Sequence, residues 1–287
     1  MNLQDWDLTT TPGVSMSRDS YRTVRTPDGL RLASTLTEPD GRQPRRAVLL
    51  VQGASVTREE GGFFTRLAEG LAEVDIASLR IDLPGHGESE GRQEDLSLFA
   101  LLNVIRGSIE HLSGAVPGVR TSLAAASFSG GVAACYAAER PDDVERLVLF
   151  NPLLDYRGRF IEEKSAWSAD GYLNDKEAAD LKERGYLGHG PGFRLGRAVL
   201  NEAFWFEARQ NLPRITAPTL IVHGTEDTFV PVESSRAADR ELTCEHRLIQ
   251  LEGAQHGFAV HDDPKYADPR TQAWQRQVIR EVQEWLR

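Results

Sequence analysis

Near its start the chain holds two short stretches in which apolar and polar residues alternate. They span residues 21–26 and 30–36, and a Pro-Asp-Gly triplet at 27–29 separates them. Alternation with a period of two on both sides of a tight turn predicts a β-hairpin. Residues 1–19 are polar and show no such period, so we expect them to form a loosely ordered leader.

From residue 47 onward, short apolar runs alternate with segments of helical periodicity. The runs that predict strands are 47–51, 76–81, 123–126, 146–150, 219–223 and 247–251. The segments that predict helices are 63–71, 98–112, 130–138, 233–242 and 271–286. Strands without polar alternation are typical of a parallel sheet that is buried on both faces. The sequence therefore predicts an α/β fold in which helices cover both faces of a mostly parallel sheet.

The alternation is interrupted once, after the sixth expected strand, by residues 152–213. This segment has no strong strand pattern, and Asn174 and Glu177 have the spacing of a capping box before one of its helical patches. It also carries nine aromatic residues. We expect it to form a helical lid on a core built from residues 20–151 and 214–287.

Composition and charge limit the functions to consider. The net charge is −10 over 287 residues, which disfavours non-specific binding to nucleic acid or to anionic membranes. The two cysteines, Cys135 and Cys244, have no disulfide or metal-site spacing, and Cys135 lies in an apolar run typical of a buried, inert thiol. Neither a signal-peptide pattern nor an apolar stretch near roughly 18 residues is present, so we expect a cytoplasmic protein.

The serine at position 127 follows an apolar run and precedes a helical pattern. Residues 123–126 are apolar, and only small residues occur at 129–131. A strand, a serine and a helix with small flanking residues predict a nucleophile elbow, which exposes the hydroxyl at a sharp turn. The usual form is Gly-x-Ser-x-Gly, whereas Ala125 and Ser129 occupy the glycine positions here.

A nucleophilic serine needs a base, and the base needs an acid that orients it. Asp227 follows the strand at 219–223, and His256 follows the strand at 247–251. The order Ser127, Asp227, His256 is the order that this fold class requires. Because the carboxyl ends of parallel strands meet at one edge of the sheet, we predict a catalytic triad of these three residues.

Other residues compete for each role. Ser129 also fits a small-x-Ser-x-Gly pattern, but it would end its strand at 127–128. Glu226 is the alternative acid, with a longer side chain that starts one residue nearer the strand. His246 opens a strand and His261 lies in a polar run, so both are weaker candidates for the base.

An oxyanion hole needs two backbone N–H donors near the nucleophile. We expect them at Phe128, directly after the nucleophile, and at Ala54, in the loop after the strand at 47–51. Gly53 allows that loop to turn inward. Gln52 stands where esterases usually have histidine, and we expect its amide to hydrogen-bond the loop.

The run 82–89, Asp-Leu-Pro-Gly-His-Gly-Glu-Ser, also holds an acid, a histidine and a serine. Its Pro-Gly turn and close spacing do not suit a triad. We interpret Asp82 and His86 as braces of a loop near the site.

Four of these runs together resemble the α/β-hydrolase superfamily, over residues 20–287. The runs are 82–89, 127–131, 223–231 and 252–258. The resemblance implies an α/β-hydrolase fold with Ser127, Asp227 and His256 as its triad. The run 76–91 and the loops of Asp227 and His256 look like bacterial cinnamoyl and feruloyl esterases, in which a lid after the sixth strand covers an aromatic acyl pocket.

A second likeness indicates a different substrate class. Residues 123–129 are similar to the Ala-Ser-x-Ser elbow of the long-chain acyl-ACP thioesterases of bacterial bioluminescence, and residues 193–206 are similar to their lid. This likeness favours acyl-thioester chemistry over a simple esterase.

The leading hypothesis is a serine hydrolase that cleaves a carboxylic ester or acyl thioester through an acyl-enzyme. A pathway-specific acyltransferase or cyclase and a C–C hydrolase use the same residues. A non-catalytic ligand-binding sensor is the rival from another class. Phe204, Trp205 and Phe206 are candidates for the acyl site, or equally for lid packing, because three consecutive residues cannot share one helix face.

No metal or organic cofactor is expected. The expected partner is a small acyl ester or thioester, free or carried on CoA or a carrier protein, and neither nucleic acid nor a membrane. The sequence leaves the acyl group, the acyl acceptor and the oligomeric state open.

Overall fold

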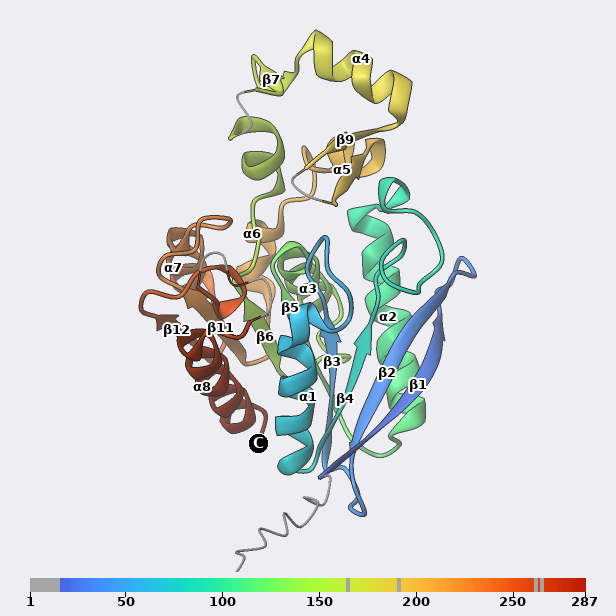
Figure 1. Ribbon diagram of the computed structural model, residues 1–287, viewed down its shortest axis with the longest axis vertical. Helices are drawn as coiled ribbons and strands as arrows, with labels where there is room; N and C mark the ends of the chain where they lie inside the picture. The colour runs from blue at the N-terminus through green and yellow to red at the C-terminus, as the bar shows by residue number, and fades with distance from the viewer. Residues whose placement is uncertain (1–15, 164–165, 190–191, 261–262, 264–265) are drawn as a thin grey trace, which may run out of the picture.

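The computed structural model describes residues 16–163, 166–189, 192–260, 263 and 266–287, and its core is an eight-stranded sheet (Figure 1). The strands are β1 (Ser17–Arg25), β2 (Arg31–Pro39), β3 (Arg46–Val51), β4 (Ile76–Ile81), β5 (Thr121–Ala126), β6 (Leu147–Phe150), β11 (Thr219–Gly224) and β12 (His246–Leu251). Their order in the sheet is β1-β2-β4-β3-β5-β6-β11-β12. The β1–β2 hairpin is antiparallel, β2 is antiparallel to β4, and the other neighbours are parallel. The prediction of a mostly parallel α/β sheet is confirmed.

Helices cover both faces of this sheet. The helices of the core are α1 (Phe63–Glu73), α2 (Leu98–Ala115), α3 (Phe128–Glu139), α7 (Val232–Glu241) and α8 (Pro269–Leu286). Successive residues of β3 point to opposite faces, so Val48 and Leu50 belong to the same hydrophobic cluster as α1 and α8, whereas Leu49 and Val51 belong to that of α2, α3 and α7. The sheet is therefore buried on both sides, as its apolar strands predict.

The first strand begins earlier than expected. Residues 17–19 belong to β1, so this part of the predicted leader is strand, and residues 1–15 lie outside the described residues. The strand is solvent-exposed along most of its length, which leaves its sequence polar and its period weak.

The segment between β6 and β11 is not purely helical. Its elements are the π-helical turn η3 (Gly158–Glu162), β7 (Ser168–Ala169), β8 (Tyr172–Leu173), α4 (Asp175–Arg184), β9 (Tyr186–Gly188), β10 (Arg194–Gly196), α5 (Arg197–Glu202), α6 (Ala208–Asn211) and the 3-10 turn η4 (Leu212–Arg214). The four strands form two small antiparallel pairs, β7–β8 and β9–β10. One half of the predicted capping box is present at the start of α4, where the Glu177 N–H donates to Asn174 Oδ1 at 2.9 Å. The reciprocal bond is not formed, because the Asn174 N–H donates to Trp167 O and the Glu177 carboxylate pairs with Lys176.

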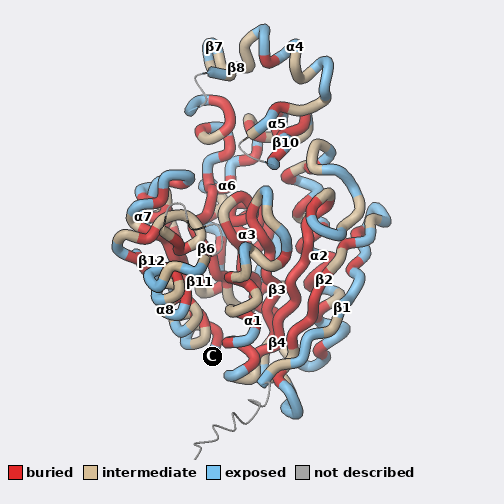
Figure 2. Tube along the Cα trace, in the orientation of Figure 1, coloured by how far each residue is buried: buried red, intermediate tan, exposed pale blue. Residues whose placement is uncertain are grey.

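This insertion rises from one edge of the sheet (Figure 1). Because β6 is parallel to β5 and β11, the chain leaves β6 at the edge where those two strands also end. Figure 2 shows a buried core, whereas α4, β7 and β8 at the far end of the insertion are largely exposed or half-buried. The strand-end loops and the insertion therefore share one side of the molecule.

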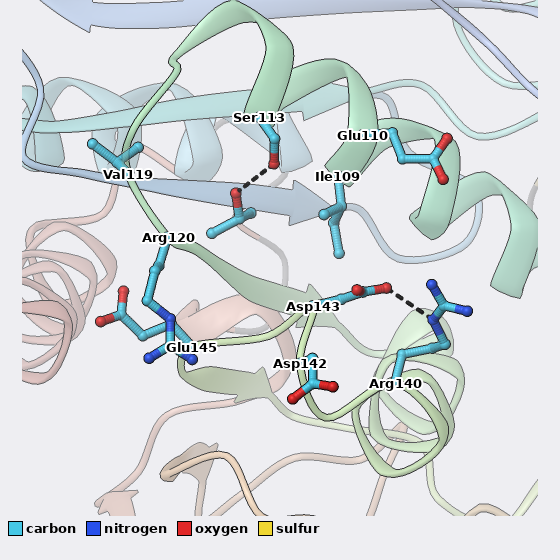
Figure 3. Close-up of a pocket in the computed structure, with 10 residues that line it drawn as sticks. Ile109, Glu110, Ser113, Val119, Arg120, Arg140, Asp142, Asp143 and Glu145 are labelled. Carbon is cyan, nitrogen blue, oxygen red and sulfur yellow. Dashed lines mark hydrogen bonds and ion pairs between the residues drawn. The ribbon is translucent and has the colours of Figure 1, made fainter.

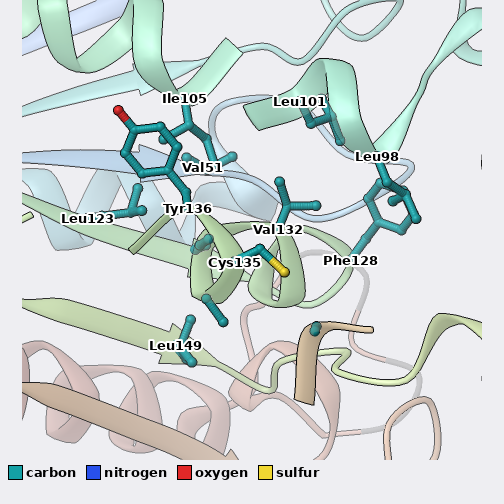
Figure 4. Close-up of a cluster of buried hydrophobic side chains, with 14 of the residues drawn as sticks. Val51, Leu98, Leu101, Ile105, Leu123, Phe128, Val132, Cys135, Tyr136 and Leu149 are labelled. Atoms are coloured by element: carbon teal, nitrogen blue, oxygen red, sulfur yellow. The ribbon is translucent and has the colours of Figure 1, made fainter. Parts of the chain in front are cut away.

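Helix α3 is buried on all sides and fixes the position of the serine that precedes it (Figure 4). Val132, Cys135 and Tyr136 pack in the larger hydrophobic cluster, together with Leu98 and Leu101 of α2. Burial raises the pKa of the Cys135 thiol to about 12, and the expected burial of this thiol is confirmed. A helix held this tightly gives its first turn little freedom to move.

None of the helices in the described ranges is both long and apolar enough to pass through a lipid bilayer.

Candidate active site

Ser127 occupies a strained turn between β5 and α3. Its backbone has φ of 48° and ψ of −115°, a conformation that non-glycine residues rarely adopt. Strain of this kind costs on the order of 1–3 kcal/mol and persists only where the surroundings enforce it. Here the Ser127 N–H donates to Phe150 O at 2.8 Å, and Leu153 N–H donates to Ser127 O at 2.9 Å. The predicted elbow geometry is present.

Two loops bring an imidazole and a carboxylate to this serine. His256 opens the short 3-10 turn η5 (His256–Phe258) after β12, and Asp227 lies in the turn after β11. His256 Nε2 is 2.9 Å from Ser127 Oγ, and His256 Nδ1 is 2.6 Å from Asp227 Oδ2. Residues that are up to 129 positions apart thus form one continuous hydrogen-bonded series.

The surroundings of Asp227 keep its carboxylate charged. Burial by itself raises the pKa of Asp227, but hydrogen bonds from His223 and His256 outweigh it and hold that pKa well below its usual range. The N–H groups of Phe229 and Val230 also donate to Asp227 Oδ1, at 2.8 and 2.9 Å. An ionised carboxylate only accepts hydrogen bonds, so His256 carries its proton on Nδ1. Nε2 is then free to accept the proton of the Ser127 hydroxyl.

His223 is a further member of this arrangement that the sequence pattern did not predict. Its Nε2–H donates to Val230 O at 2.9 Å and lies 3.4 Å from Asp227 Oδ2, while Nδ1 accepts from Ser235 Oγ at 2.6 Å. His223 is fully buried at the end of β11. It therefore links Asp227 to the turn that follows it. The signal in the sequence that could have indicated this role was the position of His223 four residues before Asp227.

The chain is similar to known hydrolases along most of its length. The family model described as serine aminopeptidase, S33, matches residues 42–173, and that of the dienelactone hydrolase family matches residues 206–285. Lipase LipV of Mycobacterium tuberculosis is 33% identical over 233 residues, which are 71% of this chain and 84% of that protein.

The chain belongs to the α/β-hydrolase superfamily.

Other relatives of this α/β-hydrolase have lower identity but longer coverage. Monoacylglycerol lipase of Mycolicibacterium smegmatis is 23% identical over 278 residues, covering 90% of this chain and 93% of that protein. Est1E from Butyrivibrio proteoclasticus, solved with ferulic acid bound, matches with a TM-score of 0.71 and 22% identity over 91% of this chain and 99% of that one. The structural match concerns the fold. Together with the named lipases, the family assignment makes this chain a hydrolase of the lipase and esterase class.

The unusual residue Ser129 in the elbow of this hydrolase has a structural role. Its hydroxyl is buried and donates to Gln52 O at 2.6 Å, which ties α3 to the end of β3. The Gln52 amide donates in turn to Val56 O at 2.6 Å, across the following loop. The hydroxyl of Ser129 is thus engaged away from His256, in contrast to that of Ser127.

The loop after β3 approaches Ser127 closely at Gly53. A Cβ atom on Gly53 would lie 3.2 Å from Ser127 Cβ, closer than most real Cβ contacts, so a side chain there would press on Ser127. Ala54 follows directly. Phe128 is the first residue of α3, so its N–H has no partner within the helix and lies at the positive end of the helix dipole. The two expected oxyanion donors are on the two segments that flank Ser127.

The competing candidates lie elsewhere. Glu226 is exposed, and His246 is at the start of β12, the opposite end of that strand from His256. His261 lies outside the described residues. Asp82 is fully buried and accepts from the Arg58 and Glu88 N–H groups, in keeping with a brace.

The three aromatic residues expected at the acyl site diverge from one another. Phe206 is buried against Tyr156 and Phe99, Phe204 stacks on Tyr172, and the Trp205 side chain is 81% exposed. Within the described residues, none of the three has a ring contact with His256 or Phe128. Their role in binding an acyl group stays a prediction.

Different aromatic side chains lie against Phe128 and His256. Phe193 packs edge-on against Phe128 with ring centroids 5.4 Å apart, and Tyr156 and Phe160 contact the same ring. Phe229, which is 53% exposed, lies 5.2 Å from the His256 ring. The sequence signal for these residues was only their membership in an aromatic-rich insertion or in the Asp227 loop.

Two hollows on the surface differ in how they lie relative to Ser127, Asp227 and His256. One of about 270 Å³ opens beside the Asp227 loop and is lined by Leu153, Phe229 and Val230 among others. Another of about 490 Å³ lies near the amino end of β5, between the last turns of α2 and α3 (Figure 3). Its lining is mostly charged, and Arg140 pairs with Asp143 inside it. The hollow in Figure 3 is at the sheet edge opposite to Ser127, so we do not connect it with the reaction.

Proposed function

We propose that this α/β-hydrolase is a serine carboxylic-ester hydrolase with Ser127 as nucleophile, His256 as general base and acid, and Asp227 as the orienting acid. The observation that carries the proposal is the hydrogen-bonded series of 2.9 Å and 2.6 Å that joins these side chains. Its support also includes the strained backbone of Ser127, which exposes the hydroxyl at the sheet edge.

The reaction follows from these contacts. His256 Nε2 takes the proton of Ser127 Oγ as Oγ attacks the ester carbonyl, and the N–H groups of Phe128 and Ala54 stabilise the oxyanion. His256 then gives this proton to the leaving alcohol as the acyl-enzyme forms. Water, activated by the same imidazole, releases the acid and restores Ser127. Asp227 stays ionised throughout and stabilises the imidazolium.

The insertion, residues 152–213, is proposed to cover the acyl group as a lid over the core of residues 20–151 and 214–287. Its support is the packing of Phe160 and Phe193 on Phe128, next to the nucleophile. These two side chains join Phe229 as candidates for contact with substrate. Phe204, Trp205 and Phe206 keep that proposed role only if the insertion rearranges when substrate binds.

An oxygen ester is favoured over a thioester. In the elbow, the thioesterase likeness rested on Ala125 and Ser129, and Ser129 has a structural reason to be present because it bonds Gln52 O. The named relatives are lipases, and the matched Est1E structure contains ferulic acid. A thioester on CoA or a carrier protein remains an outcome that the substrate test distinguishes.

Active-site labelling tests the nucleophile directly. A fluorophosphonate probe is expected to label the wild type and Ser129→Ala but not Ser127→Ala, because only Ser127 is hydrogen-bonded to His256. Absence of labelling in the folded wild type refutes the proposed function and favours the ligand-binding sensor.

A substrate panel then defines the class. It contains p-nitrophenyl esters of graded chain length, a monoacylglycerol, a feruloyl ester and the matching acyl-CoA thioesters. We expect kcat/KM to be higher for the oxygen esters than for the matched thioesters. The reverse ranking would assign the chain to acyl-thioester chemistry.

A further inference from the structure

One charged side chain beside the nucleophile has no part in the proposed mechanism. Glu60 opens the short 3-10 turn η1 (Glu60–Gly62) ahead of α1, with a backbone φ of 46°. A non-glycine residue in this left-handed region is strained, and such residues concentrate at functional sites. The strain turns the Glu60 side chain back toward the loop after β3.

The Glu60 carboxyl touches that loop at the residue before Ala54. Its Oε2 accepts the Gly53 N–H at 2.8 Å. A Cβ atom placed on Gly53 would lie 3.5 Å from Glu60 Oε1 and 3.2 Å from Ser127 Cβ. Glu60 and Ser127 therefore approach Gly53 from the same side. The carboxyl fixes the peptide that leads to the expected oxyanion donor.

We propose that Glu60 is a positioning residue of the Gly53–Ala54 loop and that its negative charge, once it forms, opposes the acylation of Ser127. The inference rests on the proposed function, because it needs an oxyanion to form beside this loop. It adds a residue and a pH dependence that the triad by itself does not supply.

No arginine or lysine among the described residues forms an ion pair with this carboxyl, and His256 is the titratable group whose charge acts on it. The neighbours of Glu60 in the chain are engaged elsewhere, since Arg58 pairs with Asp82 and Glu88, and Glu59 pairs with Arg80. Arg66 of α1 bonds Gln275. The other titratable or charged groups that face Glu60 or its neighbours are His256 on η5, Tyr266 and Asp263 on the segment before α8, and Glu69 on α1.

The protonation of Glu60 changes in the neutral range. Burial raises the pKa of Glu60 to about 7, although the Gly53 N–H and the charge of His256 act in the opposite direction. The carboxyl is thus neutral below about pH 7 and charged above it. Tyr266, whose ring lies against Gly61 and whose hydroxyl lies near Gly257, has its own phenol pKa raised by burial and by the charge of Glu60. This links the Glu60 loop with the His256 loop.

The charge of Glu60 acts on the transition state through space. The oxyanion is negative, so an ionised Glu60 repels it, whereas a neutral carboxyl holds the loop without this repulsion. The same charge attracts the His256 imidazolium, and we assign the larger effect to the oxyanion because the carboxyl is hydrogen-bonded to the oxyanion loop itself. The two like charges are the Glu60 carboxylate and the oxyanion, which lie in the same pocket. At an effective dielectric near 20, and weakened by the partial exposure of Glu60, their repulsion lowers kcat/KM by roughly tenfold. The wild-type kcat/KM is therefore expected to fall by roughly tenfold between pH 7 and pH 9.

The test compares pH profiles of kcat/KM for a p-nitrophenyl ester between pH 5.5 and 9.5. Glu60→Gln keeps an oxygen acceptor for the Gly53 N–H but never ionises, so its profile is expected to stay level from pH 7 to pH 9. Glu69→Gln removes an exposed carboxylate from α1 and is expected to keep the wild-type fall. A wild-type profile that is level from pH 7 to 9 overturns the inference, and so does an alkaline fall that persists in Glu60→Gln.

The positioning role has its own readout. Glu60→Ala leaves the Gly53 N–H without its acceptor, so at pH 7 its kcat is expected to drop by roughly tenfold relative to Glu60→Gln while KM changes little. Equal kcat values for these two variants contradict the positioning role. Fluorophosphonate labelling separates the proposals: unlabelled wild type overturns both, whereas labelled wild type with an unchanged profile in Glu60→Gln overturns this one alone.

Discussion

Gly224 is the point where the loop of Asp227 meets the loop of His256, and replacing it with alanine tests whether their separation controls the reaction. Gly224 is the last residue of β11, and its backbone φ is not in the left-handed region, so alanine has no conformational penalty there. The added Cβ would lie 2.3 Å from the carbonyl oxygen of Ala254 and 3.0 Å from that of Gln255. Both oxygens belong to backbone that cannot move aside as a side chain would.

The size of the effect follows from this overlap. Relief of the contact requires the two loops to separate by roughly 1 Å. The Asp227 Oδ2–His256 Nδ1 distance is 2.6 Å, so a shift of that size takes it past the range of a good hydrogen bond. A misplacement of about 1 Å in a catalytic group costs on the order of 10²-fold in rate. Overpacking also costs about 1–3 kcal/mol of the free energy of unfolding.

The assay is the steady-state hydrolysis of a p-nitrophenyl ester at pH 7, with urea unfolding measured in parallel. Gly114→Ala is the matched control, because a Cβ at Gly114 meets nothing within 4 Å and lies on helix α2. We expect that control to keep wild-type kcat/KM and to gain about 0.5–1 kcal/mol of stability. A folded Gly224→Ala enzyme with kcat/KM within threefold of the wild type would show that the loop contact does not set the triad geometry.

Three further outcomes are expected. Asp227→Asn should lower kcat by roughly 10⁴-fold, because an amide favours the wrong tautomer of His256, while the circular dichroism spectrum stays unchanged. A loss of kcat below tenfold would contradict the role of Asp227. Folding lowers the pKa of Asp227, so the free energy of unfolding that Asp227 adds relative to Asp227→Asn should be fully present above the unfolded-state pKa of about 3.9 and should decrease as the pH falls below it. Urea unfolding of both proteins from pH 2 to 7 measures this difference. A difference that does not change with pH would refute the expectation. Ser129→Ala should reduce the free energy of unfolding by about 1–3 kcal/mol, because the buried Gln52 carbonyl loses its hydrogen-bond donor. Fluorophosphonate labelling of Ser127 should persist. Loss of labelling in the folded variant would contradict the structural role of Ser129.

The strands and helices of the core were predictable because burial leaves a local record. The run expected at 47–51 is β3 with one residue added, and the run at 146–150 is β6 with one residue fewer. Each strand that is buried on both faces must be apolar at consecutive positions, and this pattern needs no knowledge of the neighbours. The small strands of the insertion escaped prediction because two or three residues are too few to show a period.

The candidate site was predictable only in part. Ser127, Asp227 and His256 follow strands, and parallel strands end at one edge, so their meeting could be inferred from order alone. The contribution of His223 could not, because it depends on the direction in which a buried imidazole points. Ser129 was interpreted as a sign of thioester chemistry because the sequence does not show its hydrogen bond to Gln52 O. That hydrogen bond gives Ser129 a structural role.

By itself the sequence determined the order of strands and helices, the place of the insertion and the three strand-end residues proposed as the triad, since each of these is recorded in a short window of residues. Only the tertiary structure decided which groups face those residues. Gly53 and Glu60 come beside Ser127, which is more than sixty positions away in the chain, through the pairing of β3 with β5 and the turn of η1. Such contacts depend on strand register and side-chain direction, and no local pattern of hydrophobic and polar residues encodes them.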